Sequence, residues 1–205
     1  MKTALSHLYT PTKPAEVQAS FNTLKSALYS TEACYISTPV TGGTRYTSFL
    51  SKGMNKDAHT GEYRADVVWP NVRSACGLFD TLRKHHSPVV NPAHVMQPGW
   101  VDDDYMALWL AVIQNKLVTR VVVNEGWYAS QGCVMEVAEA FLTDTPIYDC
   151  IHVADGLDKA PTMSFRAITS AIWEGRGVML KYGAPAERHD QALSALMGRA
   201  EDPSK

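Results

Sequence analysis

The sequence predicts an α/β protein whose parallel sheet has about five strands and carries helices on both faces, in the flavodoxin-like or Rossmann-like style. Short runs of β-branched and apolar residues recur along the chain, as at Val121-Val122-Val123. Segments with apolar residues at helical spacing separate these runs, and this alternation is typical of parallel sheets. A length of 205 residues with 45% apolar residues suits a single domain over 1–205 with a core of its own.

The first half of the chain opens with an amphipathic helix, predicted over 14–30, and a short apolar strand over 33–37. The region 44–67 is polar and aperiodic. A loop of that length inside a compact domain is usually functional or disordered. We therefore expect a lid or a specificity insertion there. Pro70 suits the first turn of the helix that follows.

The second half continues the alternation. A helix is predicted from the three aspartates Asp102-Asp103-Asp104, another after Gly132, and the last two over about 164–174 and 186–200. The remaining strands are predicted over 88–91, 118–124 and 146–151.

The loops that follow the strands mark the predicted site. Right-handed crossovers place the carboxyl ends of parallel strands along one edge of the sheet. The segments 37–45, 91–104 and 125–136 therefore converge at that edge. Ligands of open α/β sheets bind there.

Composition and charge exclude several classes of function. A net charge of −2 gives no electrostatic case for binding a nucleic acid polymer or an anionic membrane surface. No apolar run reaches membrane-spanning length, and the N-terminus lacks the apolar core of a signal peptide. We expect a cytoplasmic protein whose partners are small molecules.

The four cysteines are scattered without CxxC spacing, so we expect buried free thiols. No cluster of residues has metal-ligand spacing, and we expect neither a metal nor another cofactor.

The most informative segment runs from Gly126 to Glu136, between a predicted strand and a predicted helix. A carboxylate at the start of that helix can act as a nucleophile, although the helix dipole favours an acid there in any case. Gly126 and Gly132 let the backbone approach a ligand, and Ser130 lies beside unpaired helix N–H groups that suit an anion or a sugar. Trp127 either stacks on a nucleobase or packs beneath the loop.

A second carboxylate is expected from the three aspartates before the helix near residue 102. Their plain role is to cap that helix. Asp104 shares a helical face with Leu108 and is expected to point towards the sheet, whereas Asp102 and Asp103 are expected to turn more to solvent. Two facing carboxylates are the arrangement that glycosyl transfer uses.

Other candidates lie on the first two strands and the loops after them. Tyr35 either bonds to a catalytic carboxylate or belongs to the core. Gly42 and Gly43, with Arg45 close by, are similar to a phosphate-cradling turn without matching GxGxxG or a P-loop. His94 follows the second strand, where it either contacts a base or sugar or has a structural role.

Together these segments resemble the nucleoside 2-deoxyribosyltransferase-like superfamily, which includes nucleoside 5′-monophosphate N-glycosidases. The resemblance covers about 33–151 and rests on two stretches. One is Tyr35-Ile36-Ser37-Thr38-Pro39-Val40-Thr41-Gly42-Gly43; the other is Ser130-x-Gly132-x-x-x-Glu136, preceded by Gly126-Trp127.

The resemblance implies roles for individual residues. Glu136 is implied as the nucleophile and Ser130 as a contact to the sugar or the 5′-phosphate. Tyr35 and Asp104 are implied as assisting residues, and the glycine pair 42–43 as the lining of the phosphate end. Monophosphate N-glycosidases tend to carry an arginine just before that pair, where this chain has Thr41.

The implied reaction is cleavage of an N-glycosidic bond through a covalent glycosyl-glutamate intermediate. Water resolves the intermediate in an N-glycosidase, and a second base resolves it in a deoxyribosyltransferase. We favour hydrolysis, because no segment of the chain identifies a site for a second base. A non-catalytic nucleotide-binding or sensor module is the alternative from another class. The resemblance also implies a homo-oligomer.

Overall fold

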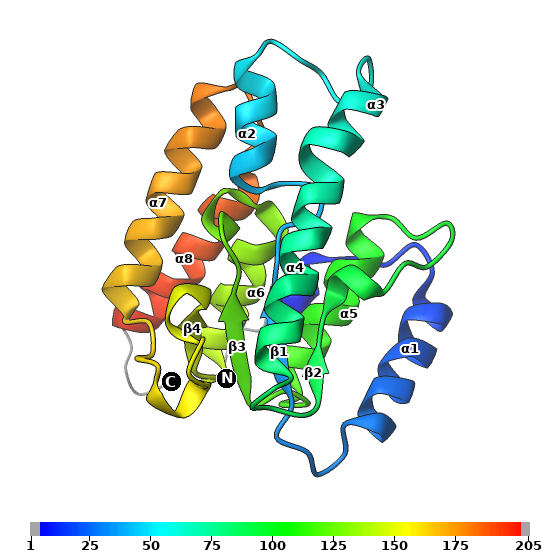
Figure 1. Cartoon of the computed structure of the whole chain (residues 1–205), viewed down its shortest axis with the longest axis vertical. Helices are drawn as coiled ribbons and strands as arrows, with labels where there is room; N and C mark the ends of the chain where they lie inside the picture. Colours follow the sequence, from blue (N-terminus) through cyan, green and yellow to red (C-terminus); the bar gives the residue numbers. More distant parts are fainter. Residues whose placement is uncertain (1–4, 202–205) are drawn as a thin grey trace.

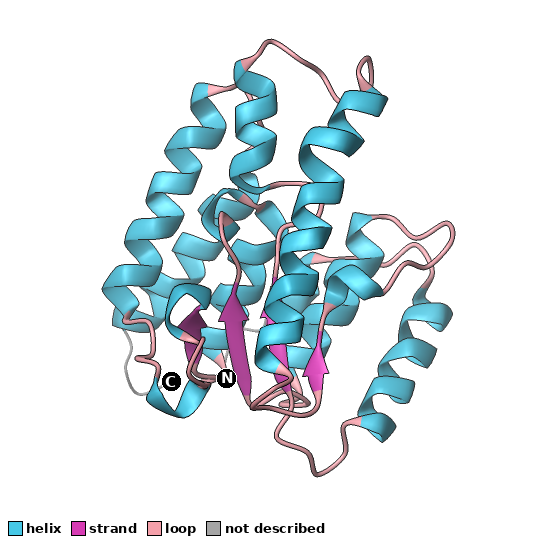
Figure 2. Cartoon of the chain, in the orientation of Figure 1, coloured by secondary structure: helices cyan, strands magenta, loops and turns pink. Residues whose placement is uncertain are grey.

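The computed structural model describes residues 5–201 and forms an α/β fold with one parallel sheet (Figures 1 and 2). The strands lie in the order β2-β1-β3-β4, and every neighbouring pair is parallel. Their bounds are β1 (Cys34–Ser37), β2 (Val89–Val90), β3 (Arg120–Val123) and β4 (Ile147–Asp149). The predicted α/β class with one parallel sheet and the four predicted strand positions are confirmed.

The expectation of about five strands is wrong for the described residues, which form four. After β4 the chain makes only an isolated antiparallel bridge between Tyr148 and Thr162. Ser164 then accepts a hydrogen bond from the Ala167 amide and begins a long helix, so no further strand forms.

Helices cover both faces of the sheet, as predicted. Cys34 and Ile36 point to one face and pack with α4 (Trp69–Leu82). Tyr35 and Ser37 alternate with them and point to the other face. There Tyr35 belongs to the larger core, which includes α5 (Asp102–Gln114) and α6 (Gln131–Leu142).

Three further helices contribute buried residues to this core. α1 (Pro14–Ala27) lies on α5, and α8 (Glu187–Glu201) lies on α6. α7 (Phe165–Lys181) lies beside α8 and extends beyond the predicted end near residue 174 (Figure 1). The short 3₁₀ segments are η1 (Leu5–Leu8), η3 (Pro92–His94), η4 (Trp127–Ala129), η5 (Cys150–His152) and η6 (Leu157–Lys159).

The region expected to be a loop over 44–67 is largely helical, which corrects the prediction. It contains α2 (Gly43–Ser51), α3 (Thr60–Tyr63) and the π-helix η2 (Arg64–Val68), which continues into α4. Phe49 of α2 is 1% exposed, and its ring packs edge-on against the ring of Tyr63 in α3. This aromatic contact packs the two helices together. They rise above the carboxyl ends of the strands (Figure 1).

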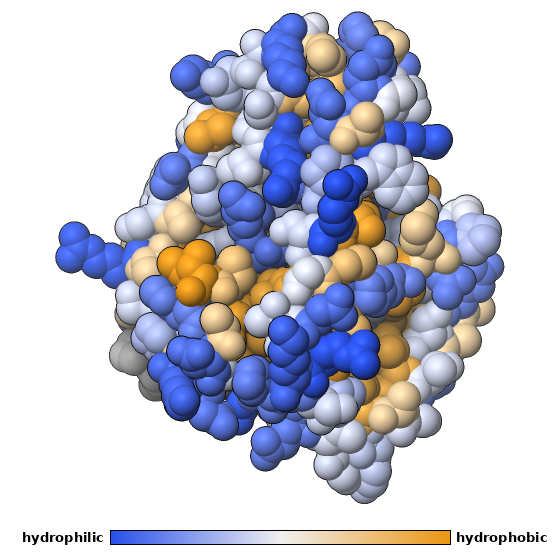
Figure 3. Space-filling model, viewed as in Figure 1, coloured by the Kyte–Doolittle hydropathy of each residue, from blue (hydrophilic) through white to orange (hydrophobic). Residues whose placement is uncertain are grey.

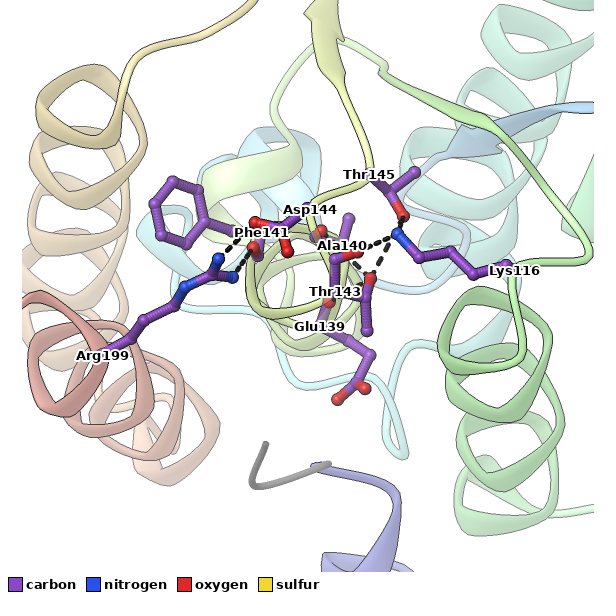
Figure 4. A network of polar contacts seen from close by, with 8 residues as sticks. All are labelled: Lys116, Glu139, Ala140, Phe141, Thr143, Asp144, Thr145 and Arg199. Carbon is purple, nitrogen blue, oxygen red and sulfur yellow. Dashed lines mark hydrogen bonds and ion pairs between the residues drawn. The ribbon is translucent and has the colours of Figure 1, made fainter. Parts of the chain in front are cut away.

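The C-terminal end of α6 is fixed by two cations (Figure 4). Arg199 of α8 donates to the carbonyl of Phe141 and to the carboxylate of Asp144. Lys116 donates to the carbonyl of Thr143 and, at 3.1 Å, to the hydroxyl of Thr145. Positive charge at a helix C-terminus complements the helix dipole and satisfies unpaired carbonyls. These contacts hold in place the helix that carries Glu136.

The surface mixes hydrophilic residues with small hydrophobic patches on the face seen in Figure 3. The most exposed large hydrophobic residues lie in different parts of the chain: Tyr29, Trp69, Met96, Ile151 and Trp173. Across residues 5–201 there is no helix with the length and apolarity needed to cross a membrane.

Candidate active site

Glu136 lies beneath the carboxyl edge of the sheet, in the second turn of α6 rather than the first. The Tyr35 hydroxyl donates a 2.7 Å hydrogen bond to Oε1, and the Ser37 hydroxyl donates one of 2.7 Å to Oε2. Tyr35 and Ser37 are fully buried, whereas Glu136 keeps 6% of its surface exposed. Both carboxylate oxygens are therefore oriented by β1.

Burial dominates the electrostatics of Glu136. It raises the pKa of this carboxyl to about 7, although the hydrogen bonds from Ser37 and Tyr35 act in the opposite direction. Burial and the neighbouring carboxylate raise the pKa of Tyr35 well above its ordinary value. Tyr35 therefore keeps its proton and acts as a donor. A carboxyl with a pKa near neutrality is the kind of group that active sites require.

Ser37 is a site residue that the sequence reasoning did not single out. It follows Tyr35 by two positions, so the two side chains point to the same face of β1. The signal was present in the strand alternation, but it identifies Ser37 only once Tyr35 is known to contact Glu136.

The loops after β1 and β3 pack tightly against one another. Gly43 has a φ of +78°, and a Cβ there would lie 2.9 Å from Pro39. Gly126 has a φ of +74°, and a Cβ there would lie 2.6 Å from the hydroxyl of Thr44. Both glycines are required by conformation and by space. Two of the three segments predicted to converge, 37–45 and 125–136, therefore meet.

Ser130 and the remaining glycines lie at this junction. Ser130 occupies the N-cap position of α6 and is 7% exposed. A Cβ on Gly42 would lie 3.4 Å from the Ser130 hydroxyl oxygen, so the structure brings these two predicted residues together. A Cβ on Gly132 would lie 3.3 Å from the sulfur of Met106, so Gly132 permits the close approach of α5 and α6.

Arg45 supports the turn after β1 through side-chain contacts. Its guanidinium donates to Asn71 Oδ1 at 2.9 Å and lies 3.5 Å from a carboxylate oxygen of Glu125. Asn71 in turn donates to the carbonyl of Gly42 at 2.9 Å. The cation expected near the phosphate end is thus tied to α4 and to the loop after β3.

Asp104 is buried, as its helical face predicted, but its carboxylate has structural partners. Oδ1 accepts from the Lys13 amide at 2.9 Å, and Oδ2 accepts from the Thr12 hydroxyl at 2.8 Å and the Val101 amide at 3.0 Å. Burial acts to raise the pKa of Asp104, but these hydrogen bonds outweigh it and hold the pKa below its ordinary value. The residue caps α5 and ties the N-terminal segment to it.

Asp103 is more exposed than Asp104, as expected, and belongs to a cluster that the sequence did not reveal. It pairs at 3.0 Å with Arg188 of α8. The Arg188 guanidinium lies over the ring of Tyr9, 5.0 Å from its centroid. Burial raises the pKa of Tyr9 to about 12; the Arg188 guanidinium acts to lower it, and Asp103 and Glu136 act to raise it.

The Tyr9 hydroxyl is buried and has no hydrogen-bond partner among the described residues. An unpaired buried hydroxyl costs free energy, so one near a carboxylate is a candidate for contact with a ligand. No sequence motif indicates Tyr9 or Arg188. They reach this place because the N-terminal segment and the first turn of α8 meet beside α5.

Two residues predicted as candidate substrate contacts have other neighbours in the structure. Trp127 is 4% exposed and belongs to the larger core, which is the packing alternative for this residue. The His94 side chain forms a separate cluster, where Nε2 lies 3.3 Å from the sulfur of Cys76 and 3.3 Å from the side-chain nitrogen of Asn91.

Comparison of the chain with protein-family models, curated proteins and solved structures finds no match. Among residues 5–201, no group of three or more histidine, cysteine, aspartate or glutamate side chains is placed to hold a metal ion. The site is therefore defined by its own side chains: Glu136 with its two hydroxyl donors, and the cluster of Tyr9, Asp103 and Arg188.

Proposed function

We propose that the protein cleaves the N-glycosidic bond of a nucleoside or a nucleoside 5′-monophosphate, with Glu136 as the nucleophile. The observation that carries the proposal is the buried Glu136 carboxylate, each of whose oxygens accepts a 2.7 Å hydrogen bond from a hydroxyl of β1. A nucleophile fixed in this way loses little further freedom when a substrate binds, and this favours attack on an electrophilic carbon.

The proposed reaction has two displacements. A Glu136 oxygen attacks C1′, the C1′–N bond breaks, and its electron pair leaves with the base, which takes up a proton. Water then attacks C1′ of the glycosyl ester, and the bond to Glu136 breaks with return of the carboxylate. Only the ionised form of Glu136 attacks. The rate of the first step should therefore rise with pH around the pKa of about 7.

The cluster of Tyr9, Asp103 and Arg188 is proposed to hold the substrate. Asp103 takes the role of the second carboxylate, because both oxygens of Asp104 already accept structural hydrogen bonds. Arg188 pairs with Asp103 at 3.0 Å and holds its carboxylate in place. The phenol of Tyr9, protonated at neutral pH, is proposed to donate to the bound substrate.

The 5′ end of the substrate is assigned to the junction of the two loops. Ser130 and Gly42 lie together there, at the N-terminus of α6, where backbone N–H groups and the helix dipole favour an anion. Arg45 already pairs with Glu125 and Asn71, so it is proposed to stabilise this turn through those contacts. Comparing nucleosides with their 5′-monophosphates tests whether the junction takes a phosphate.

Base release tests the proposal. The protein is incubated with a panel of nucleosides and 5′-monophosphates, and free base is followed by chromatography. We expect release by the native protein and none by Glu136→Ala. Glu139→Gln is the matched control, since Glu139 is also buried on α6 but accepts its hydrogen bond from the Leu5 amide. It should retain the activity.

The outcomes separate the rival functions. A new nucleoside formed after addition of a second base would identify a deoxyribosyltransferase. Binding of nucleotide without release of base would identify a sensor or binding module. Release at the native rate by Glu136→Ala would remove Glu136 from the mechanism. Light scattering of the same preparation measures whether the chain forms the homo-oligomer expected from the resemblance.

A further inference from the structure

Cys76 and His94 form a thiol–imidazole pair away from Glu136. Cys76 lies on α4 and is partly exposed, and its sulfur is 3.3 Å from Nε2 of His94 in η3. The His94 ring packs edge-on against Phe79, with centroids 5.1 Å apart. Phe79 follows Cys76 by three positions on the same helix. One turn of α4 therefore carries both the Cys76 thiol and the aromatic ring that packs against His94.

The side chain of Asn91 indicates which tautomer of the His94 imidazole faces the Cys76 sulfur. Its side-chain oxygen accepts from the Ala93 amide at 3.0 Å, so its side-chain nitrogen faces His94 Nε2 at 3.3 Å. An amide nitrogen only donates, so this contact favours the tautomer with Nε2 as the acceptor and the ring proton on Nδ1. An acceptor nitrogen at this distance from a thiol can take its proton.

The other three cysteines have different environments. Cys34 and Cys133 are buried, and burial raises the pKa of each, to about 12 for Cys34. Cys150 is partly exposed like Cys76, but burial and Asp149 raise its pKa to about 11. All four thiols are free. Of the four, only Cys76 combines partial exposure with an imidazole nitrogen at contact distance.

We propose that Cys76 is a thiol modification site that forms a mixed disulfide with small disulfides, with His94 as its base. The Cys76 proton moves to His94 Nε2, and the thiolate attacks one sulfur of the disulfide. A new S–S bond forms at Cys76, the original S–S bond breaks, and the departing thiolate takes the proton from His94. Cys76 is oxidised, and the released half of the reagent is reduced. Within residues 5–201, no third ligand of the histidine, cysteine, aspartate or glutamate type joins this pair.

The folded native protein can be titrated with 4,4′-dithiodipyridine at pH 7, which reports each thiol by absorbance. We expect one fast thiol. Cys76→Ser should abolish the fast phase, and Cys150→Ser should leave it unchanged. His94→Ala should slow the fast phase by about tenfold or more, since loss of a general base costs at least that much. His85→Ala is the control for removing an exposed histidine.

Peptide mapping gives a result that needs no variant. The native protein is treated with oxidised glutathione, and the modified cysteine is located by mass spectrometry. A glutathione adduct on Cys76 supports the proposal. An adduct on Cys150 instead, no adduct on Cys76, or a His94→Ala variant that reacts at the native rate would overturn it. A His94→Ala variant that unfolds would expose all four thiols to the reagent, and the mapping of the native protein then decides.

Discussion

The hydroxyl of Tyr35 donates a 2.7 Å hydrogen bond to Glu136, although 101 positions separate the two residues in the chain. Both are buried, and the same carboxylate also accepts from Ser37 at 2.7 Å. The contact joins β1 to α6 and lowers the pKa of Glu136 from the value that burial alone would produce. The ionisation of Glu136 therefore depends on a hydrogen bond inside the core.

Tyr35→Phe should raise the pKa of Glu136 above its value of about 7. A hydrogen bond to a charged group contributes about 1.5 to 3 kcal/mol, so its loss should raise the pKa by about one pH unit or more. The pH midpoint of base release should move upwards by the same amount. Ser37→Ala removes the other donor and should shift it in the same direction. An unchanged midpoint in both variants would show that neither hydroxyl tunes the carboxyl.

The stability of the protein should depend on the ionisation of Glu136. Because the folded-state pKa of about 7 lies above the ordinary value of 4.5, the folded state binds the proton more tightly. The contribution of this group is fully present below pH 4.5 and is lost as the pH rises through 7, by about 3 kcal/mol in total. Glu136→Gln should lack this loss. Urea unfolding at pH 5 and pH 8 measures it, and an equal pH dependence in both proteins would contradict the expectation.

The elements that the sequence predicts well have strong local signals. The strand at Val121 to Val123 is a β-branched run, and Glu136 follows it at a spacing that a strand, a glycine turn and a helix explain. These signals depend only on residues that are close together in the chain, so the elements can be predicted from the sequence. The helices over 43–68 were missed because their apolar residues are few and separated by polar ones.

The rest of the site depends on contacts between distant segments. Tyr9 and Arg188 lie near opposite ends of the chain, yet the Arg188 guanidinium carbon is 5.0 Å from the centroid of the Tyr9 ring. The spacing of apolar residues along the sequence does not predict this contact. The local sequence pattern predicts the helical face on which Asp104 lies. Its partners Thr12 and Lys13, however, come from a segment 91 or more positions away. Tertiary packing therefore gives the Asp104 carboxylate its structural partners.

Tyr9→Phe should make the protein more stable and less active. The Tyr9 hydroxyl is buried without a partner in the described part of the chain, so its removal should stabilise the fold by about 1 kcal/mol. If the phenol donates to the substrate, base release should fall by about tenfold or more. Thermal unfolding and the release assay measure the two effects. Unchanged base release in the folded variant would show that the phenol does not act on the substrate.

Gly175 and Gly177 provide a matched test of how α7 is attached. A Cβ on Gly175 would collide with the carbonyl of Tyr128, whereas one on Gly177 meets nothing within 4 Å. Gly175→Ala should therefore separate α7 from η4 and cost several kcal/mol, as overpacking against backbone does. Gly177→Ala should be neutral or stabilise by about 0.5 to 1 kcal/mol through helix propensity. Urea unfolding of both variants distinguishes these effects, and equal stabilities would disprove the close approach.

Asp103 and Asp104 are neighbours for which we expect opposite consequences. Asp104→Ala leaves the Lys13 and Val101 amides and the Thr12 hydroxyl without their acceptor, so the melting temperature should fall by several degrees. Asp103→Ala removes one partly exposed ion pair with Arg188, which contributes little to stability. Its melting temperature should stay close to the native value.

Activity should show the reverse order. Asp103→Ala should lower base release strongly in a folded protein, because it removes the proposed second carboxylate and releases Arg188 from its place over Tyr9. Asp103→Asn keeps the shape and removes the charge, so recovery of activity in this variant would show that Asp103 acts through hydrogen bonding alone. Asp104→Ala should retain activity at temperatures where it remains folded. If Asp104→Ala is instead inactive while folded and Asp103→Ala is active, the second carboxylate is Asp104, as the helical pattern first indicated.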